Sequence, residues 1–187
     1  MTPEPVYAIA QLGAPVLRQI AAPVADIHAA DTLATIAALQ DTLANSQGVG
    51  LAAPQIGISQ RIIIVASRPT TRYPYAPLMA PTVMVNPRYD ITSAQQEKDW
   101  EGCLSIPSIR ALVPRYQHIS VHYTDTAGEA VSLALDGFVA RVFQHEYDHL
   151  EGKVYLDRVE SSLDIVAESE FFKRLAADKM PPPPQPD

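Results

Sequence analysis

The sequence predicts an α+β fold in which mostly antiparallel strands surround a central helix, with a further helix near the C-terminal end. Apolar residues recur at helical spacing in residues 31–45, and start and stop signals enclose a second internal helix at about 138–150. Strands and helices do not alternate regularly, which favours this arrangement over a doubly wound parallel sheet. Short runs rich in β-branched residues indicate strands at 61–66, 79–85, 116–124 and 130–135.

Two helices are predicted before the sheet begins. Residues 15–21 can form a short first helix, and residues 31–45 form a longer one. Gly48 follows the longer helix as a stop signal. The apolar residues on one face of this longer helix are Leu33, Ile36, Leu39 and Leu43.

The first two strands are predicted from runs of apolar residues. Residues 61–66 contain Ile-Ile-Ile-Val, a continuous apolar run that is typical of a buried strand. The next strand, at 79–85, is ended by Asn86-Pro87.

The next two strands are predicted to form a hairpin. Residues 116–124 alternate loosely and are rich in β-branched side chains. Residues 125–129 contain Gly128 and predict a turn that leads into the strand at 130–135.

Two helices are predicted to complete the chain. The central helix at about 138–150 follows Asp136, a residue type favoured at N-caps, and is closed by Gly152. A last helix is predicted at 161–179.

Composition excludes several classes of protein. The chain has 187 residues, a net charge of −7 and no cluster of Lys and Arg, so direct nucleic-acid binding is disfavoured. No apolar run approaches the roughly 20 residues that cross a bilayer, and residues 1–11 show neither a secretory signal nor a transit peptide. We therefore expect no membrane partner. One domain is expected over residues 1–179, followed by a disordered Pro-rich tail at 180–187.

Residues 145–149, His-Glu-Tyr-Asp-His, carry the strongest chemical signal in the chain. Residues four apart share one helical face, so His145 and His149 can bind one metal ion and Glu146 can reach a water on it. This HExxH pattern is typical of metal-assisted hydrolysis. A chance match on a charged helix is the alternative, but the flanking residues are apolar and favour a metal partner.

A hydrolytic metal site usually needs a third protein ligand and an open position for water. The candidates are Cys103, His118, His122 and several carboxylates. Cys103 is the distinctive choice, and it lies in a polar stretch, 101–107, that reads as a loop or an edge strand. Cys103 can also be a small buried hydrophobe or a nucleophile, although histidines at this spacing are better explained as co-ligands. As the single cysteine it suits a reducing cytosol.

Residues 48–57, Gly-Val-Gly-Leu-Ala-Ala-Pro-Gln-Ile-Gly, form a second unusual stretch. Its glycines allow the backbone of a ligand to approach closely. The stretch lacks the GK[ST] ending of a phosphate loop, so nucleotide binding is disfavoured. Gln55 can make a structural hydrogen bond or can donate an amide N–H to a developing oxyanion.

Taken together, these segments resemble the peptide deformylase family. The family motifs GxGLAAPQ, EGCLS and QHExDHL correspond to residues 48–55, 101–105 and 144–150, in the same order. The resemblance spans roughly residues 11–157, because Leu-Gly-Ala-Pro-Val-Leu-Arg at 12–18 also looks like the N-terminal segment of the family.

The resemblance implies an α+β hydrolase of protein biosynthesis and N-terminal processing. Its reaction removes the formyl group from the formylmethionine of nascent polypeptides and releases formate. The implied metal ligands are Cys103, His145 and His149, and the ion is typically Fe²⁺, which Zn²⁺, Ni²⁺ or Co²⁺ can replace. The implied partners are formyl-Met N-termini, and the implied location is a bacterium-like cytoplasm.

The resemblance also assigns roles around the metal. Glu146 takes a proton from water and delivers it to the leaving amine, while the Gln55 side chain and the Leu104 backbone N–H stabilise the oxyanion. Val49, Gly50 and Gly102 correspond to positions whose backbones bind the substrate chain. The side chains expected around the methionine are those of Val49, Phe138 and Val142.

The sequence leaves the roles of two arginines and of the last helix open. Arg110 corresponds to a substrate-proximal arginine of many relatives, but an arginine there can equally be structural. Arg141 shares the ligand face one turn before His145, so it can border the pocket or face away into solvent. The last helix mixes acidic and basic residues, so a tight ribosome contact is not predicted and a transient one stays open.

Two other functions compete with deformylation. An HExxH endopeptidase would cut internal peptide bonds in preference to a formylated peptide. A non-catalytic relative would bind metal or peptide N-termini without releasing formate, although Glu146, Gln55 and the three expected ligands are all present.

Overall fold

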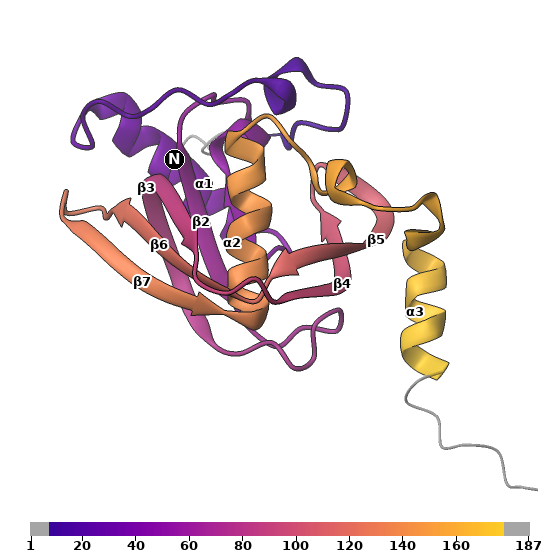
Figure 1. Cartoon of the computed structure of the whole chain (residues 1–187). Coiled ribbons are helices and arrows are strands. Elements are labelled where there is room, and N and C mark those ends of the chain that lie inside the picture. Colours follow the sequence, from indigo (N-terminus) through magenta and orange to yellow (C-terminus); the bar gives the residue numbers. More distant parts are fainter. Residues whose placement is uncertain (1–7, 178–187) are drawn as a thin grey trace, which may run out of the picture.

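The computed structural model describes residues 8–177. The domain boundary expected at residue 179 and the tail expected at 180–187 lie outside these residues. Two sheets, with the strand orders β1-β2-β3-β6-β7 and β4-β5-β8, surround helix α2, Gly137–Leu150 (Figure 1). All strand pairs within the two sheets are antiparallel, which confirms the predicted α+β class.

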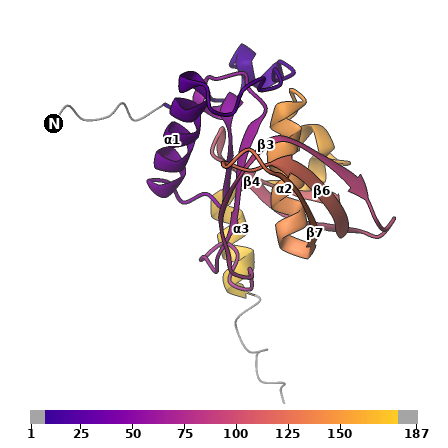
Figure 2. The ribbon, with the colours of Figure 1, turned by 90° about the vertical axis from the view of Figure 1, so that its left-hand side faces the viewer.

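The larger sheet lies between two helices (Figure 2). Ile63 and Val65 of β2 belong to the apolar layer against α2, whereas Ile62 and Ile64 belong to the layer shared with α1, Ala30–Ala44. Strand β2 is therefore buried on both faces, which explains its continuous apolar run. The strands of this sheet are β1 Gly50–Ala52, β2 Ile62–Ser67, β3 Met79–Ile91, β6 His118–Thr124 and β7 Ala130–Asp136.

The smaller sheet is built on a hairpin that the sequence did not predict. Strands β4, Gln96–Cys103, and β5, Ile106–Tyr116, are joined by a two-residue turn at Leu104-Ser105. The stretch 101–107, expected to be a loop or an edge strand, is thus the closed end of this hairpin. Cys103 is the last residue of β4, so the hairpin holds its side chain beside α2.

Strand β3 passes through the position where the sequence predicted its end. Asn86 has a φ of 50°, and the pairing with β6 shifts register between Val85 and Arg88. This bulge accommodates Pro87, which cannot donate to the sheet, and the strand then continues. The Asn86 side chain holds the bend, because it donates to and accepts from the backbone of Val24 at 2.8 Å in each case.

The two terminal helices differ from their predictions. The first is only a short 3₁₀-helix, Pro15–Arg18, rather than a helix over 15–21. The last, α3, is Glu168–Ala177, because Ile165–Ala167 forms β8 and pairs with β5. Helix α3 is held to the smaller sheet by Phe171, whose ring lies 5.5 Å from that of Trp100.

The predicted hairpin and central helix are confirmed. Asp125 donates its N–H to the carbonyl of Glu129 at 2.9 Å, and Gly128 has a φ of 88°, a conformation that favours glycine. Asp136 occupies the N-cap position of α2, but its side chain makes no cap hydrogen bond and contacts His118 instead.

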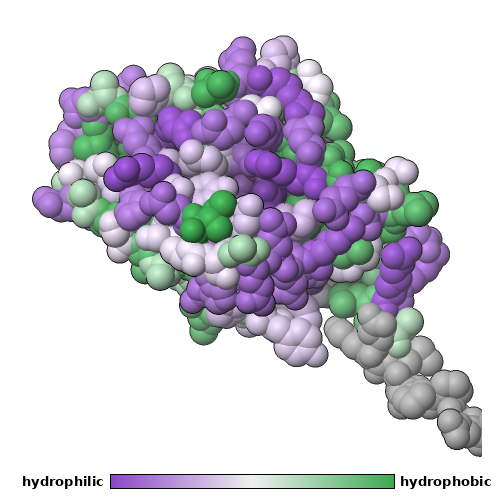
Figure 3. Space-filling model, viewed as in Figure 1, coloured by the Kyte–Doolittle hydropathy of each residue, from purple (hydrophilic) through white to green (hydrophobic). Residues whose placement is uncertain are grey.

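Most large apolar side chains are buried in the layers around α2 and α1. On the face shown in Figure 3, hydrophobic residues form separate spots on a largely hydrophilic surface. Among residues 8–177, no helix has both the length and the apolar character needed to cross a membrane.

Candidate metal site and catalytic pocket

Helix α2 and the β4–β5 hairpin bring together three side chains that could hold a metal ion. His145 and His149 lie one turn apart on α2, and one donor atom from each, with Sγ of Cys103, falls within 4.8 Å of the other two. Cys103 Sγ lies 3.4 Å from His149 Nε2. Four ligands at about 2.0–2.3 Å from a tetrahedral ion stand about 3.3–3.8 Å apart, so this donor set fits one ion with little adjustment.

The other candidate histidines lie away from this cluster. His118 Nδ1 contacts Asp136 Oδ1 at 2.6 Å, and His122 Nδ1 contacts Ser132 Oγ at 2.7 Å. Both pairs join β6 to β7, so these histidines are not part of the donor set.

The protonation state of Cys103 suits metal binding. Burial alone would raise the pKa of its thiol, but His149 and His145 beside it outweigh burial and hold the pKa well below the usual value. The thiolate is the form of cysteine that binds metals. His149 is fully buried and His145 is 8% exposed, which is costly for imidazoles that lack a partner.

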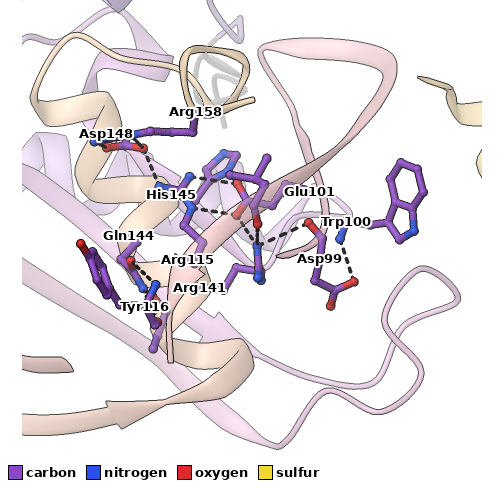
Figure 4. Close-up of polar contacts among 12 residues, drawn as sticks. Asp99, Trp100, Glu101, Arg115, Tyr116, Arg141, Gln144, His145, Asp148 and Arg158 are labelled. Carbon is purple, nitrogen blue, oxygen red and sulfur yellow. Dashed lines mark hydrogen bonds and ion pairs between the residues drawn. The ribbon is translucent and has the colours of Figure 1, made fainter. Parts of the chain in front are cut away.

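Glu101 fixes the orientation of His145, a role that the motif alone did not indicate (Figure 4). Its Oε2 lies 2.8 Å from His145 Nδ1, which leaves Nε2 of this ring for a metal. Burial raises the pKa of Glu101, but Arg115 and His145 outweigh burial, so the pKa is well below its usual range. A carboxylate behind a histidine ligand is a recurrent way to set the tautomer and direction of the ring.

Glu146 is a buried carboxylate that lines the pocket beside the donor set. Its Oε2 has no hydrogen-bond partner among residues 8–177. Burial raises the pKa of Glu146 to about 7, although His145 and His149 lower it. A carboxyl group with a pKa near neutrality can both accept and return a proton, and a water in the site would satisfy its free oxygen.

Gln55 is held with its amide N–H group toward the same place. Its Oε1 accepts from the backbone N–H of Ala52 at 2.9 Å, and its Nε2 donates to Cys103 Sγ at 3.3 Å and to Ser105 Oγ at 3.2 Å. The structural hydrogen bonds of the first sequence interpretation therefore exist on both sides of the amide. The N–H group is at the same time directed at the three side chains that could hold a metal.

A pocket of about 360 Å³ opens above these groups. His149 lies behind the pocket and does not line it, whereas Cys103, His145 and Glu146 do. The pocket is also lined by every residue predicted to bind substrate or oxyanion, namely Val49, Gly50, Gln55, Gly102, Leu104, Arg110, Phe138 and Val142.

Arg110 lines the pocket, and its guanidinium is also hydrogen-bonded to other side chains of the protein. Its Nη1 donates to the Tyr73 hydroxyl at 3.0 Å, and its Nε donates to Glu168 Oε2 at 3.2 Å. A Cβ at Gly102 would lie 2.4 Å from Arg110 Nη1, so the glycine gives this guanidinium its path along the pocket wall. Neither Tyr73 nor Glu168 belongs to the sequence motifs, and only the tertiary structure brings them here.

Arg141 is not solvated, so that interpretation of the sequence is wrong. The residue is 4% exposed, and its Nη1 donates to Glu101 Oε1 at 3.0 Å and to the carbonyl of Val113 at 2.7 Å. Its Nη2 donates to the carbonyl of Glu97 at 2.7 Å. Arg141 therefore lines the pocket, and buried hydrogen bonds hold its guanidinium in place.

The site has the composition of a metal-dependent hydrolase. It combines two histidines and a glutamate from one helix with a cysteine from a neighbouring hairpin and an amide donor beside a pocket. Comparison with known proteins identifies the kind of hydrolase. Residues 6–164 match the family described as polypeptide deformylase. The chain belongs to this family.

Individual relatives support the assignment. The chain is 52% identical over 171 residues to peptide deformylase 2 of Nostoc sp., which covers 91% of this chain and 95% of that protein. A Met-Ala-Ser-bound crystal structure of a class I type b peptide deformylase from Acinetobacter baumannii is 42% identical, with a TM-score of 0.80 over 83% of this chain and 99% of that one. An actinonin complex of a peptide deformylase from Synechococcus elongatus has 36% identity and a TM-score of 0.75, over 87% of this chain and 83% of that one. The chain is therefore a metal-dependent hydrolase of protein biosynthesis that removes the N-terminal formyl group from nascent polypeptides.

Gly50→Ala is expected to lower kcat for formate release by about 100-fold while the metal content stays unchanged. A Cβ at this position would lie 2.4 Å from Glu146 Oε1 and 2.8 Å from its Cγ, so the carboxylate must move. A displacement of about 1 Å at a reacting group can cost this much in rate. Steady-state kinetics with a formyl-Met peptide, together with elemental analysis, measures both quantities.

The control for Gly50→Ala is the same change in a Glu146→Gln background. If the alanine acts by displacing Glu146, the double variant should be little slower than Glu146→Gln alone. A further 100-fold loss in that background would contradict the assigned cause.

Proposed function

We propose that Cys103, His145 and His149 hold one divalent ion, natively Fe²⁺ and replaceable by Zn²⁺, Ni²⁺ or Co²⁺. Formyl-Met N-termini are the proposed substrate, and they would bind in the pocket beside this ion. The observation that carries the proposal is the convergence of three donor atoms within 4.8 Å beside a pocket that Glu146 and Gln55 also line.

The proposed reaction is hydrolysis of a formamide. When bound, the ion would polarise the formyl oxygen and lower the pKa of a water at the site. Glu146 accepts a proton from the attacking water as the new C–O bond forms. It then gives that proton to the amine nitrogen as the C–N bond breaks, which leaves formate and a free N-terminus. Its pKa of about 7 suits both transfers.

The formyl oxygen gains negative charge while the carbon is tetrahedral. Gln55 Nε2 and the Leu104 backbone N–H are the proposed donors to this oxygen. Gln55 is suited to the role because the N–H of Ala52 fixes its Oε1, which keeps the amide N–H group directed at the site. Loss of one such donor typically costs about 10²–10³ in rate.

The polypeptide after the formyl group is proposed to bind as an added strand. Strand β1 is at one end of its sheet, so its backbone has a free edge beside Val49 and Gly50. Gly102 would supply a backbone contact from the opposite wall. The methionine side chain is proposed to contact Val49, Phe138 and Val142. Backbone recognition of this kind tolerates many sequences after the methionine.

We place the reaction in the cytoplasm of a bacterium, because the proteins reported above come from bacteria and formylated chains emerge from ribosomes there. Any ribosome contact is proposed to be transient. The charges on α3 are mixed, since Glu168 and Glu170 offset Lys173 and Arg174.

The deciding experiment is formate release from formyl-Met-Ala-Ser under anaerobic conditions, with elemental analysis of the same sample. Acetyl-Met-Ala-Ser is the control, because its extra methyl group should not fit a site built around a formyl carbon. Preferential cleavage of internal peptide bonds would favour an HExxH endopeptidase. A metal-loaded sample that releases no formate would favour a non-catalytic binding protein.

The Fe²⁺ form is expected to lose activity in air much faster than under argon. Both the ferrous ion and its thiolate ligand can be oxidised. The half-life of formate release measures this directly, and a Ni²⁺-substituted sample, whose metal is not oxidised by air, is the matched control. Equal half-lives in air and under argon for the enzyme as purified would argue for another native metal.

A further inference from the structure

We propose that Arg141 is a positioning residue that fixes helix α2 against the β4–β5 hairpin and thereby sets the distance between the two halves of the metal site. The proposal rests on the metal site described above. It assigns a role to a side chain that the sequence left open.

The donor set is divided between two elements of the fold. His145 and His149 belong to α2, whereas Cys103 belongs to the end of β4. The apolar layer that holds α2 faces the larger sheet, through residues such as Phe143 and Val139. On the side facing the smaller sheet, polar contacts join the helix to the hairpin (Figure 4).

Arg141 makes several of the contacts that span this interface, and Gln144 makes others to the backbone of Tyr116 at 3.1 and 2.8 Å. The Arg141 guanidinium donates to the carbonyl of Glu97 on β4 at 2.7 Å and to the carbonyl of Val113 on β5 at 2.7 Å. Carbonyl oxygens of a sheet cannot change rotamer, so they fix the guanidinium to the frame of the hairpin. The planar fork of an arginine presents its N–H donors to both strands in fixed directions, whereas a lysine offers a single ammonium on a flexible stem.

Glu101 connects this contact to the ligand. Its Oε1 accepts from Arg141 Nη1 at 3.0 Å, and its Oε2 lies 2.8 Å from His145 Nδ1. Arg141 is one turn before His145 on the same helical face. The arginine therefore holds both the helix backbone and the carboxylate that directs the ligand ring.

Arg115 on β5 makes a second set of contacts in the same network. Arg115 binds both oxygens of Glu101, at 2.9 and 3.0 Å, and reaches Asp148 at 2.7 Å. Arg158 binds Asp148 from outside, at 2.6 and 3.1 Å. This outer arginine contacts neither Glu101 nor a metal ligand, so it provides a matched control for loss of a charge from the same network.

The test uses the single thiol of the chain. Protein stripped of metal by chelation is exposed to iodoacetamide at a series of Co²⁺ concentrations, and protection of Cys103 reports metal binding without any measurement of activity. Arg141→Met is expected to raise the Co²⁺ concentration for half-protection by about 10- to 100-fold, the usual effect of removing a partner behind a metal ligand. Arg158→Met should leave that concentration unchanged, even where both variants unfold at a lower temperature.

The outcomes separate the two proposals. Half-protection of Arg141→Met at the wild-type Co²⁺ concentration would overturn the positioning role. If Arg141→Met does not fold, Arg141→Lys decides, with weakened protection supporting the role and wild-type protection rejecting it. If no Co²⁺ concentration protects the wild-type thiol, the metal site itself fails and the role of Arg141 fails with it.

Discussion

Glu146→Gln is expected to lower the turnover of a formyl-Met peptide by about 10²–10⁴-fold and to leave the metal content unchanged. An amide has nearly the shape of a carboxylate but cannot accept the proton of the attacking water. General acid–base catalysis typically contributes a factor of this size. Formate release and elemental analysis of the same preparation measure the two quantities.

The fold should tolerate this change for a structural reason. Glu146 takes no part in the ion pairs that join Glu101 to Arg115 and Arg141, so its neutralisation leaves no buried guanidinium without a partner. Glu160→Gln is the matched control, because Glu160 is exposed and pairs with Lys98 at 3.3 Å on the surface. Near-normal formate release by Glu146→Gln, with metal bound, would refute its role as the base.

The parts of the fold that could be predicted are those with a strong local signal. The apolar periodicity of α1 and the continuous apolar run of β2 follow from burial, and α2 was marked by the residues at its two ends. Each element lies within a few residues of its expected position. The hairpin β4–β5 has no such signal. Its turn, Leu104-Ser105, contains none of the glycine or asparagine residues that usually mark a two-residue loop, and much of β4 is exposed and polar.

Two further errors have a tertiary cause. The sequence ended β3 at Pro87, but the positive φ of Asn86 and its bonds to Val24 let the strand bend and continue. Residues 165–167 were assigned to the last helix, yet they form β8 because the free edge of β5 is available to them. Local propensity contains no information about such a partner strand.

The same division applies to the site. The motifs predicted that Cys103, His145, His149 and Glu146 form one site, because metal chemistry restricts both residue type and spacing. They did not identify the network behind the ligands, in which Arg141 belongs to α2 and Arg115 to β5. In a sequence, a charged side chain such as Arg141 is usually expected to be exposed to solvent. Only the packed hairpin provides the carboxylate and the carbonyl groups that make its burial favourable.

Cys103→Ala is expected to weaken metal binding by at least about 100-fold and to abolish formate release at ordinary metal concentrations. Loss of a partner behind a ligand already costs about 10- to 100-fold, and here the thiolate itself is removed. The two histidines that remain are fewer than the three protein ligands of a stable catalytic site. Elemental analysis after gel filtration measures occupancy. Ser105→Ala, a change at a buried residue of the adjoining turn, should retain the ion.

Thermal or denaturant unfolding gives an independent measure of the weaker metal binding expected for Cys103→Ala. A ligand that binds only the folded protein stabilises it by RT ln(1 + [L]/Kd), about 4 kcal/mol when its free concentration is about 1,000 times Kd. A 100-fold weaker Kd removes about 2.7 kcal/mol of that stabilisation. Added Co²⁺ should therefore raise the unfolding midpoint of the wild-type protein and of Ser105→Ala much more than that of Cys103→Ala. Equal metal-induced shifts in all three proteins would reject Cys103 as a ligand, because the ion would then be held without its thiolate.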